Sequence, residues 1–178
     1  MNLETLIAEK KSAILGRWFD LAIASYPAET ASFLKSKKNR FANPVGFILS
    51  QELTPILDGL LQGVEVQTLK PFLDNIIRIR AVQDFAPSRA LKFVFSLKET
   101  IRQELEKEIR ENRLEQQLLI LESRIDVLSL LAFDLFVQCR EKIYDLKANE
   151  MKNRTVRLLK RAKLVEEDLL EPLPGSDS

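Results

Sequence analysis

Apolar residues recur every three or four positions along most of the chain, and this spacing predicts an all-α fold. The first predicted helix covers residues 2–25 and ends before Pro27, because proline has no backbone N–H to donate to a helix. A second helix of about two turns follows from Ala28 to Leu34. The first 34 residues of the chain are therefore expected to form two helices.

The middle of the chain carries clear start and stop signals. Asn43 followed by Pro44 predicts a helix start, because Asn caps free backbone N–H groups and proline is tolerated at the first helical position. Gly63 is the expected C-terminal cap. Pro55 lies inside this pattern, where a kink or a break is expected. After a turn over residues 64–67, the spacing predicts another helix over residues 69–80.

The last half of the chain predicts long helices. One is expected from Pro87 to about Glu111, and residues 114–164 contain no proline or glycine, so they form either one very long helix or two. Residues 125–137 are almost continuously apolar, which is typical of a central core helix at that length rather than of a membrane span. The pattern thus predicts a multi-helix bundle of about six helices with a long C-terminal helix, and both a plain bundle and a globin-like arrangement fit it.

The corner between two of these helices, residues 76–97, concentrates polar and aromatic side chains. Arg78 and Arg80 lie two residues apart and project to opposite sides of a helix, so their default role is structural, at the negative end of the helix dipole. The alternative is that one of them meets Asp84 or a bound anion. Asp134 lies in the apolar stretch and needs a partner if it is buried, so we predict an ion pair with Arg78 or Arg80. Four aromatic residues near this corner are candidates for a pocket: Phe85, Phe93, Phe95 and Phe133.

Composition narrows the function. The chain has no histidine and one cysteine, Cys139, and its net charge is +1. The usual imidazole base, haem ligand and most zinc sites are thereby excluded, and no arrangement of acidic residues suggests catalysis. We expect no catalytic residues, no cofactor and no metal, and no nucleic-acid partner. A lone cysteine and the lack of a secretory signal favour the cytoplasm.

A basic amphipathic segment precedes the C-terminus. Between residues 147 and 163 the only acidic residue is Glu150. This helix could be an ordinary solvated one, contact an acidic partner, or make weak contact with an anionic membrane surface. The candidate partner-binding residues are Lys152, Arg154, Arg157, Lys160 and Arg161. Residues 166–178 are acidic at first and read as a disordered tail.

Three segments resemble the RsbRD-type N-terminal domain, which occurs in RsbT co-antagonist, stressosome-like regulators. They are residues 8–18, residues 40–46 (Arg-Phe-Ala-Asn-Pro-Val-Gly) and residues 77–88, which begin Ile-Arg-Ile-Arg-Ala-Val-Gln-Asp-Phe. The resemblance implies an all-helical input or interaction domain over roughly residues 1–145. Because little sequence follows, we expect a stand-alone copy. The expected organisation is a sensor or interaction domain over 1–146, a basic helical extension over 147–165 and the tail over 166–178.

Two functions are consistent with these observations. The first is a non-enzymatic signalling or adaptor module that acts by protein–protein interaction or by ligand sensing near the Phe85–Phe95 corner. The alternative is a peripheral accessory protein that docks on a membrane complex or an acidic partner through its basic helix. A homodimer is expected in either case, since a long helix must cover its apolar stripe against something.

Overall fold

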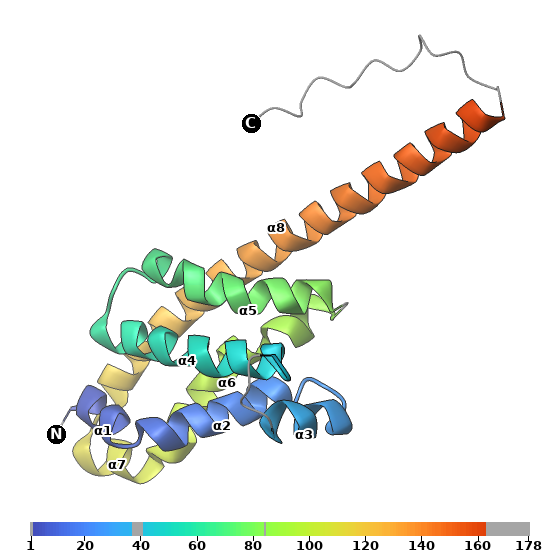
Figure 1. Ribbon diagram of the computed structural model, residues 1–178. Helices are drawn as coiled ribbons and strands as arrows, with labels where there is room; N and C mark the ends of the chain where they lie inside the picture. Colours follow the sequence, from blue (N-terminus) through green and yellow to red (C-terminus); the bar gives the residue numbers. More distant parts are fainter. Residues whose placement is uncertain (1, 37–40, 84, 163–178) are drawn as a thin grey trace. The chain divides into compact units, whose positions relative to one another are not determined.

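The computed structural model describes residues 2–36, 41–83 and 85–162, and the part of the chain that it describes contains eight α-helices, one short 3-10 helix and no β-strand (Figure 1). The predicted all-α class is confirmed. The helices, in chain order, are α1 (Leu3–Glu9), α2 (Lys11–Ile23), α3 (Ala28–Ser36), α4 (Pro44–Gln62), η1 (Val66–Leu69), α5 (Lys70–Val82), α6 (Pro87–Glu104), α7 (Glu106–Asn112) and α8 (Glu115–Arg161).

Eight helices replace the predicted six because two predicted helices are interrupted. The first breaks at Lys10 and the helix from Pro87 breaks at Leu105, where the backbone leaves helical geometry. A side chain at the first break contacts residues on either side of the second. Lys10 Nζ donates to the carbonyl of Glu104 at 2.7 Å and pairs with Glu108 at 2.5 Å. A lysine at one interruption thus satisfies acceptors at the other, which local periodicity along the chain does not reveal.

Helix α4 begins and ends where predicted. Asn43 is buried, and its side chain accepts from the Gly46 N–H at 2.8 Å and donates to the Leu34 carbonyl at 2.7 Å. Gly63 closes the helix with a positive φ of 67°, a conformation that glycine adopts without steric cost. Of the kink or break expected at Pro55, the break is excluded, because α4 continues through this residue. For residues 114–164 one helix or two were considered, and the described residues of this range, up to 162, contain the single helix α8 (Glu115–Arg161).

The chain divides into two units, residues 1–140 and residues 141–178. In the first unit α2 packs against α4 and α6, and α4 packs against α5. The core between them includes Trp18, Leu57, Phe93 and Leu97, each at most 2% exposed. The disordered tail predicted over 166–178 lies outside the described residues.

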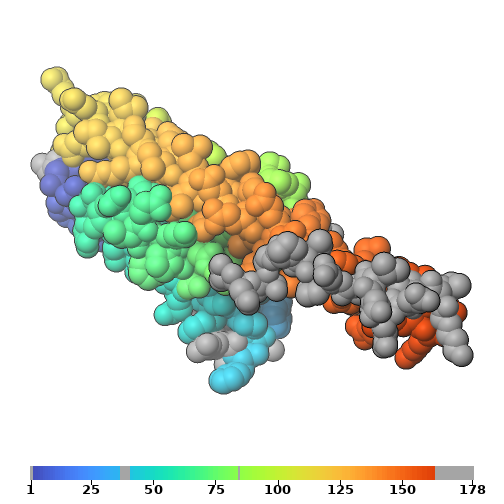
Figure 2. All heavy atoms as spheres, turned by 90° about the horizontal axis from the view of Figure 1, so that it is seen from above, coloured from blue at the N-terminus to red at the C-terminus, as the bar shows by residue number. Residues whose placement is uncertain are grey.

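Within the first unit, α8 has one buried and one exposed face. Ile125, Leu128 and Ala132 are fully buried. Other apolar side chains of the same helix are at least half exposed: Leu119, Ile120, Val127, Leu130 and Phe133. The segment 115–140 as a whole contributes to the surface seen in Figure 2. Residues 125–137, predicted to belong to a central core helix, are therefore buried on one face only. None of the described helices is both long enough and apolar enough to cross a membrane.

Candidate functional site

Arg80 lies in the core at the junction of α2, α5 and α6. Its side chain is 1% exposed. Nη2 donates to the Ala22 carbonyl at 2.7 Å, and Nη1 donates to Ser25 Oγ at 3.1 Å and to the Ala90 carbonyl at 3.2 Å. Its carbon Cζ also lies over three aromatic rings, at 4.8 Å from Phe93, 5.6 Å from Tyr26 and 6.0 Å from Phe85. Arg80 thus holds three helices together through carbonyl oxygens and ring faces.

This geometry overturns the predicted ion pair with Asp134. Asp134 is exposed, so it has no buried charge to neutralise. Arg78 is also exposed and pairs with Asp74, one turn earlier on α5, at 2.5 Å. Among the described ion pairs none joins Asp134 to Arg78 or Arg80. Asp84, the other carboxylate considered, lies outside the described residues. The prediction that the two arginines project to different surroundings is confirmed.

Burial shifts the pKa values of two groups in this cluster. Desolvation lowers the pKa of Arg80, although the nearby Tyr26 acts against it, and Nε has no hydrogen-bond partner in the described part of the chain. Desolvation also raises the pKa of Tyr26, against the opposing effects of Arg80 and of Gln83, whose Oε1 accepts from the Tyr26 hydroxyl at 2.6 Å. The cluster therefore favours a neutral phenol beside a guanidinium that is stabilised mainly by dipoles.

We expect the raised pKa of Tyr26 to make the protein less stable above pH 10. Below the ordinary tyrosine pKa of 10.0, the folded protein and the unfolded chain both keep the phenolic proton. As the pH rises, the unfolded chain loses this proton first, so the free energy of unfolding falls. Tyr26→Phe should flatten this fall between about pH 9 and pH 11. Urea unfolding at several pH values checks it, with Tyr144→Phe, on an exposed position, as the control. An unchanged slope in Tyr26→Phe would contradict the assignment.

The predicted aromatic pocket is only partly assembled. Phe95 and Phe133 line one apolar groove between α6 and α8, with a volume of about 670 Å³, together with Leu91, Leu130 and Lys92. Phe93 points the other way, into the core against Arg80, and Phe85 stacks edge-on against Tyr26 at 5.2 Å. The four residues therefore divide between a surface groove and the Arg80 cluster, because they fall on different faces of α6 and of the corner.

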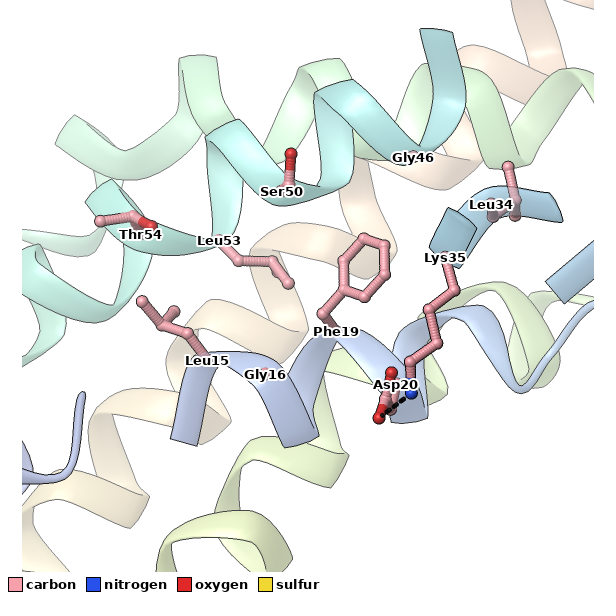
Figure 3. Close-up of a pocket in the computed structure, with 10 residues that line it drawn as sticks. All are labelled: Leu15, Gly16, Phe19, Asp20, Leu34, Lys35, Gly46, Ser50, Leu53 and Thr54. Carbon is pink, nitrogen blue, oxygen red and sulfur yellow. Dashed lines mark hydrogen bonds and ion pairs between the residues drawn. The ribbon is translucent and has the colours of Figure 1, made fainter. Parts of the chain in front are cut away.

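A second pocket, which the sequence pattern did not suggest, lies between α2, α3 and α4 (Figure 3). Its volume is about 470 Å³, and Leu15, Phe19 and Leu53 supply apolar walls. The ion pair between Lys35 and Asp20, at 2.8 Å, lies at one end. Gly16 forms part of the lining, and a Cβ built there meets nothing within 4 Å. A volume of this size suits a small, mostly apolar molecule.

The predicted partner-binding residues all lie on the second unit's part of α8. Lys152, Arg154, Arg157, Lys160 and Arg161 are exposed. Arg154 pairs with Glu150 at 3.1 Å, four residues earlier on the helix, and Arg157 Nε donates to the Asn153 carbonyl at 3.4 Å. Exposed pairs of this kind contribute a few tenths of a kcal/mol at most, so they leave the positive charge available to a partner.

A catalytic arrangement is not among these features. The described carboxylates that form ion pairs do so with lysines and arginines, as Glu122, which is 7% exposed, does with Arg102 at 2.5 Å. Within the described ranges, no three acidic or cysteine residues gather where they could hold a metal ion. What the described residues offer instead is an apolar groove, an apolar pocket and a basic helix.

The chain matches one protein-family model, described as the RsbT co-antagonist protein rsbRD N-terminal domain, over residues 12–151. This range covers most of the 178 residues and includes the Arg80 cluster, the α6–α8 groove and the pocket between α2, α3 and α4. The curated proteins and the solved structures contain no match to this chain.

Proposed function

The chain belongs to the family of rsbRD-type N-terminal domains of RsbT co-antagonist proteins, which are regulatory input domains, and on this premise we propose that it is a non-enzymatic regulatory module that acts through protein–protein contact as a homodimer. The observation that supports this is the apolar face of α6 and α8. Phe95, Leu130 and Phe133 are 51%, 68% and 50% exposed around the groove. Contiguous exposed apolar side chains of this size are typical of an interaction surface.

A second copy of the chain is the occupant that we propose for this face, because one two-fold contact would cover the exposed apolar side chains of both copies at once. The ion pairs Lys98–Asp126 and Arg102–Glu122 show that α6 and α8 run antiparallel here. Asp126 therefore lies at one end of the groove, level with Lys98, and Lys92 lies nearer its middle. In a two-fold dimer the same patch meets itself in reverse, so Phe95, Leu130 and Phe133 of one copy would be covered by the same three side chains of its partner.

Analytical ultracentrifugation of the full chain tests the dimer. The wild type is expected to sediment with twice the chain mass of 20.5 kDa. Phe133→Asp combined with Leu130→Asp is expected to sediment as a monomer, because charges in an apolar interface lose their hydration without gaining a partner. Both positions are exposed in the single chain, so the fold should remain intact by circular dichroism.

The matched control is Val82→Asp, an apolar-to-acidic change at a position that is 72% exposed at the end of α5, a helix that contributes no lining residue to the groove. It should leave the dimer unchanged. A monomeric wild type at about 100 μM, or equal effects of the control and the double variant, would overturn the proposed interface.

The pocket between α2, α3 and α4 favours a second candidate function, the sensing of a small apolar molecule. Gly16 carries this argument, because glycine inside a helix costs about 1 kcal/mol relative to alanine and no neighbour requires its small size. Gly46, on the opposite side, differs: a Cβ there would lie 2.6 Å from the Leu34 carbonyl. Gly16 is thus the lining position where a larger residue would fill the pocket without disturbing the core.

We expect Gly16→Leu to abolish the fluorescence increase of 1-anilinonaphthalene-8-sulfonate on the folded protein, whereas Gly16→Ala should keep most of it. Both variants should be more stable than the wild type, by about 0.5–1 kcal/mol in urea unfolding, because both side chains favour a helix. Dye binding that is unchanged in Gly16→Leu would mean that the pocket is not the binding site.

A further inference from the structure

The described residues of the second unit, 141–162, carry an apolar seam along one face of α8. Tyr144, Met151 and Leu158 are 54%, 70% and 65% exposed and are spaced seven residues apart. Ala148 and Thr155 fall between them, four residues after one seam position and three before the next. Apolar positions at alternating intervals of four and three residues are typical of a helix that packs along another helix as a coiled coil.

One flank of this seam is uniformly basic. Lys147, Arg154 and Arg161 are also spaced seven residues apart, and each follows a seam residue by three positions. All three are exposed. The other flank is mixed, with Asp145 and Lys152 each one residue after a seam position. In a coiled coil these flanking positions lie opposite charged residues of the partner helix and decide which partner is accepted.

We propose that this face of α8 binds an acidic amphipathic helix of a partner protein, with Tyr144, Met151 and Leu158 in the seam and the Lys147–Arg154–Arg161 row facing acidic side chains. The contact would extend over about three heptads, or roughly 30 Å of helix. This inference goes beyond the proposed dimer, because it does not involve the groove between α6 and α8.

The charges argue against a second copy of the chain on this seam. In a parallel pair, each basic flank position faces the other flank of the partner five residues on, which sets Lys147 beside the second copy's Lys152. In an antiparallel pair, the row of Lys147, Arg154 and Arg161 faces the same row of the second copy. Both arrangements place like charges together, which disfavours self-association, whereas glutamates or aspartates would relieve the repulsion.

The structure also separates two kinds of basic residue on this helix. Arg157 and Lys160 fall on the side opposite the seam, since they lie six and nine residues after Met151 at 3.6 residues per turn. Lys142 lies on that opposite side as well, two residues before Tyr144. These three are exposed like the flanking row. The proposal therefore removes Arg157 and Lys160 from the five predicted partner-binding residues. Together with Lys142 they provide a control with the same number and sign of charges on the opposite face.

Binding of two synthetic three-heptad peptides to the full chain tests the proposal. Both have leucine at the seam; one has glutamate and the other lysine at the flanks. Fluorescence anisotropy is expected to show binding of the glutamate peptide only, weakened by salt because the contacts are exposed. Lys147→Glu/Arg154→Glu/Arg161→Glu should weaken that binding at least about tenfold and admit the lysine peptide.

The control variant Lys142→Glu/Arg157→Glu/Lys160→Glu changes the net charge equally and should bind the glutamate peptide within about threefold of the wild type. Circular dichroism checks that both variants keep their helix content. Equal losses in the two variants, or binding of neither peptide, would overturn the proposal. So would binding of the wild type to vesicles of anionic lipid that both triple variants lose equally, since this would indicate a membrane surface as the ligand. Each outcome leaves the sedimentation test of the groove unaffected.

Discussion

Replacing Arg80 with alanine is expected to lower the free energy of unfolding by about 3–5 kcal/mol. The side chain is 1% exposed and fills the space between the rings of Phe93, Tyr26 and Phe85. Alanine would leave a cavity there and remove the hydrogen bonds that join α5 to Ala22 on α2 and Ala90 on α6. Because small domains are stable by only about 5–15 kcal/mol, this is a large fraction of the total. Urea unfolding followed by the fluorescence of Trp18, the only tryptophan, measures it.

Arg80→Met is the matched control, because it keeps most of the volume and removes the charge. A buried guanidinium carries a desolvation cost that an apolar side chain avoids. The Ala90 carbonyl belongs to a residue inside α6, where a backbone N–H can also reach it. The Ala22 carbonyl lies in the last turn of α2 and also accepts from Ser25 Oγ at 2.9 Å. We therefore expect a loss of about 1–2 kcal/mol, less than half of that for alanine. Equal losses in the two variants would show that the charge on the rings, rather than the filled volume, holds the corner together.

The sequence predicted those features whose causes are local. Asn43 and Gly63 bound α4 because a cap depends on the residues within one turn of it. The end of the first helical region before Pro27 follows from the same kind of rule. Breaks that depend on distant residues were missed. At the interruption between α1 and α2, the side chain of Lys10 contacts Glu104 and Glu108. These residues lie more than ninety positions away, and no spacing along the chain indicates such a contact.

The candidate site was harder to predict because its partners are backbone atoms. Asp134 lies in the most apolar stretch, so it was expected to be buried and to need Arg78 or Arg80 as its partner. Arg80 instead uses carbonyl oxygens and ring faces, which every sequence contains and no residue pattern marks. Asp134 is exposed because the apolar stretch of α8 also has an exposed face, to which Leu130 and Phe133 belong. Residues 125–137 are apolar on every side of the helix, and this pattern was interpreted as burial on every side. An exposed interaction surface is also rich in apolar residues, so composition alone does not distinguish the two.

The sequence contains one weak indication of the pocket between α2, α3 and α4, which is a glycine inside a helix. Gly16 interrupts an amphipathic helix whose neighbours, Leu15 and Phe19, are apolar. Glycine within a helix often marks a close approach of backbones, but here a Cβ would meet nothing within 4 Å. In the sequence, a glycine that allows two backbones to pack closely cannot be distinguished from a glycine that lines an open pocket. Only the positions of α3 and α4 around α2 distinguish a packed glycine from one that leaves a pocket open.

Trp18→Ala is expected to destabilise the first unit by about 3–5 kcal/mol, as large aromatic truncations in cores do. Trp18 is completely buried on α2, and its Nε1 donates to the Phe93 carbonyl on α6 at 2.7 Å. It lies in the packing of α2 against α6, so its loss should loosen the helices that also carry the Arg80 contacts. Urea unfolding followed by circular dichroism at 222 nm measures the change, because the variant has no tryptophan.

Trp18→Phe separates the ring from its hydrogen bond. Phenylalanine keeps an aromatic ring in the core but has no donor for the Phe93 carbonyl. That carbonyl also accepts from Ser96 Oγ at 2.7 Å, so it stays satisfied and avoids the full cost of a buried unpaired acceptor. The expected loss is therefore about 1–2 kcal/mol, from the smaller ring alone. If Trp18→Phe were as damaging as Trp18→Ala, the indole N–H would be the main tie between α2 and α6, and Trp18→Phe/Ser96→Ala should then add little further loss.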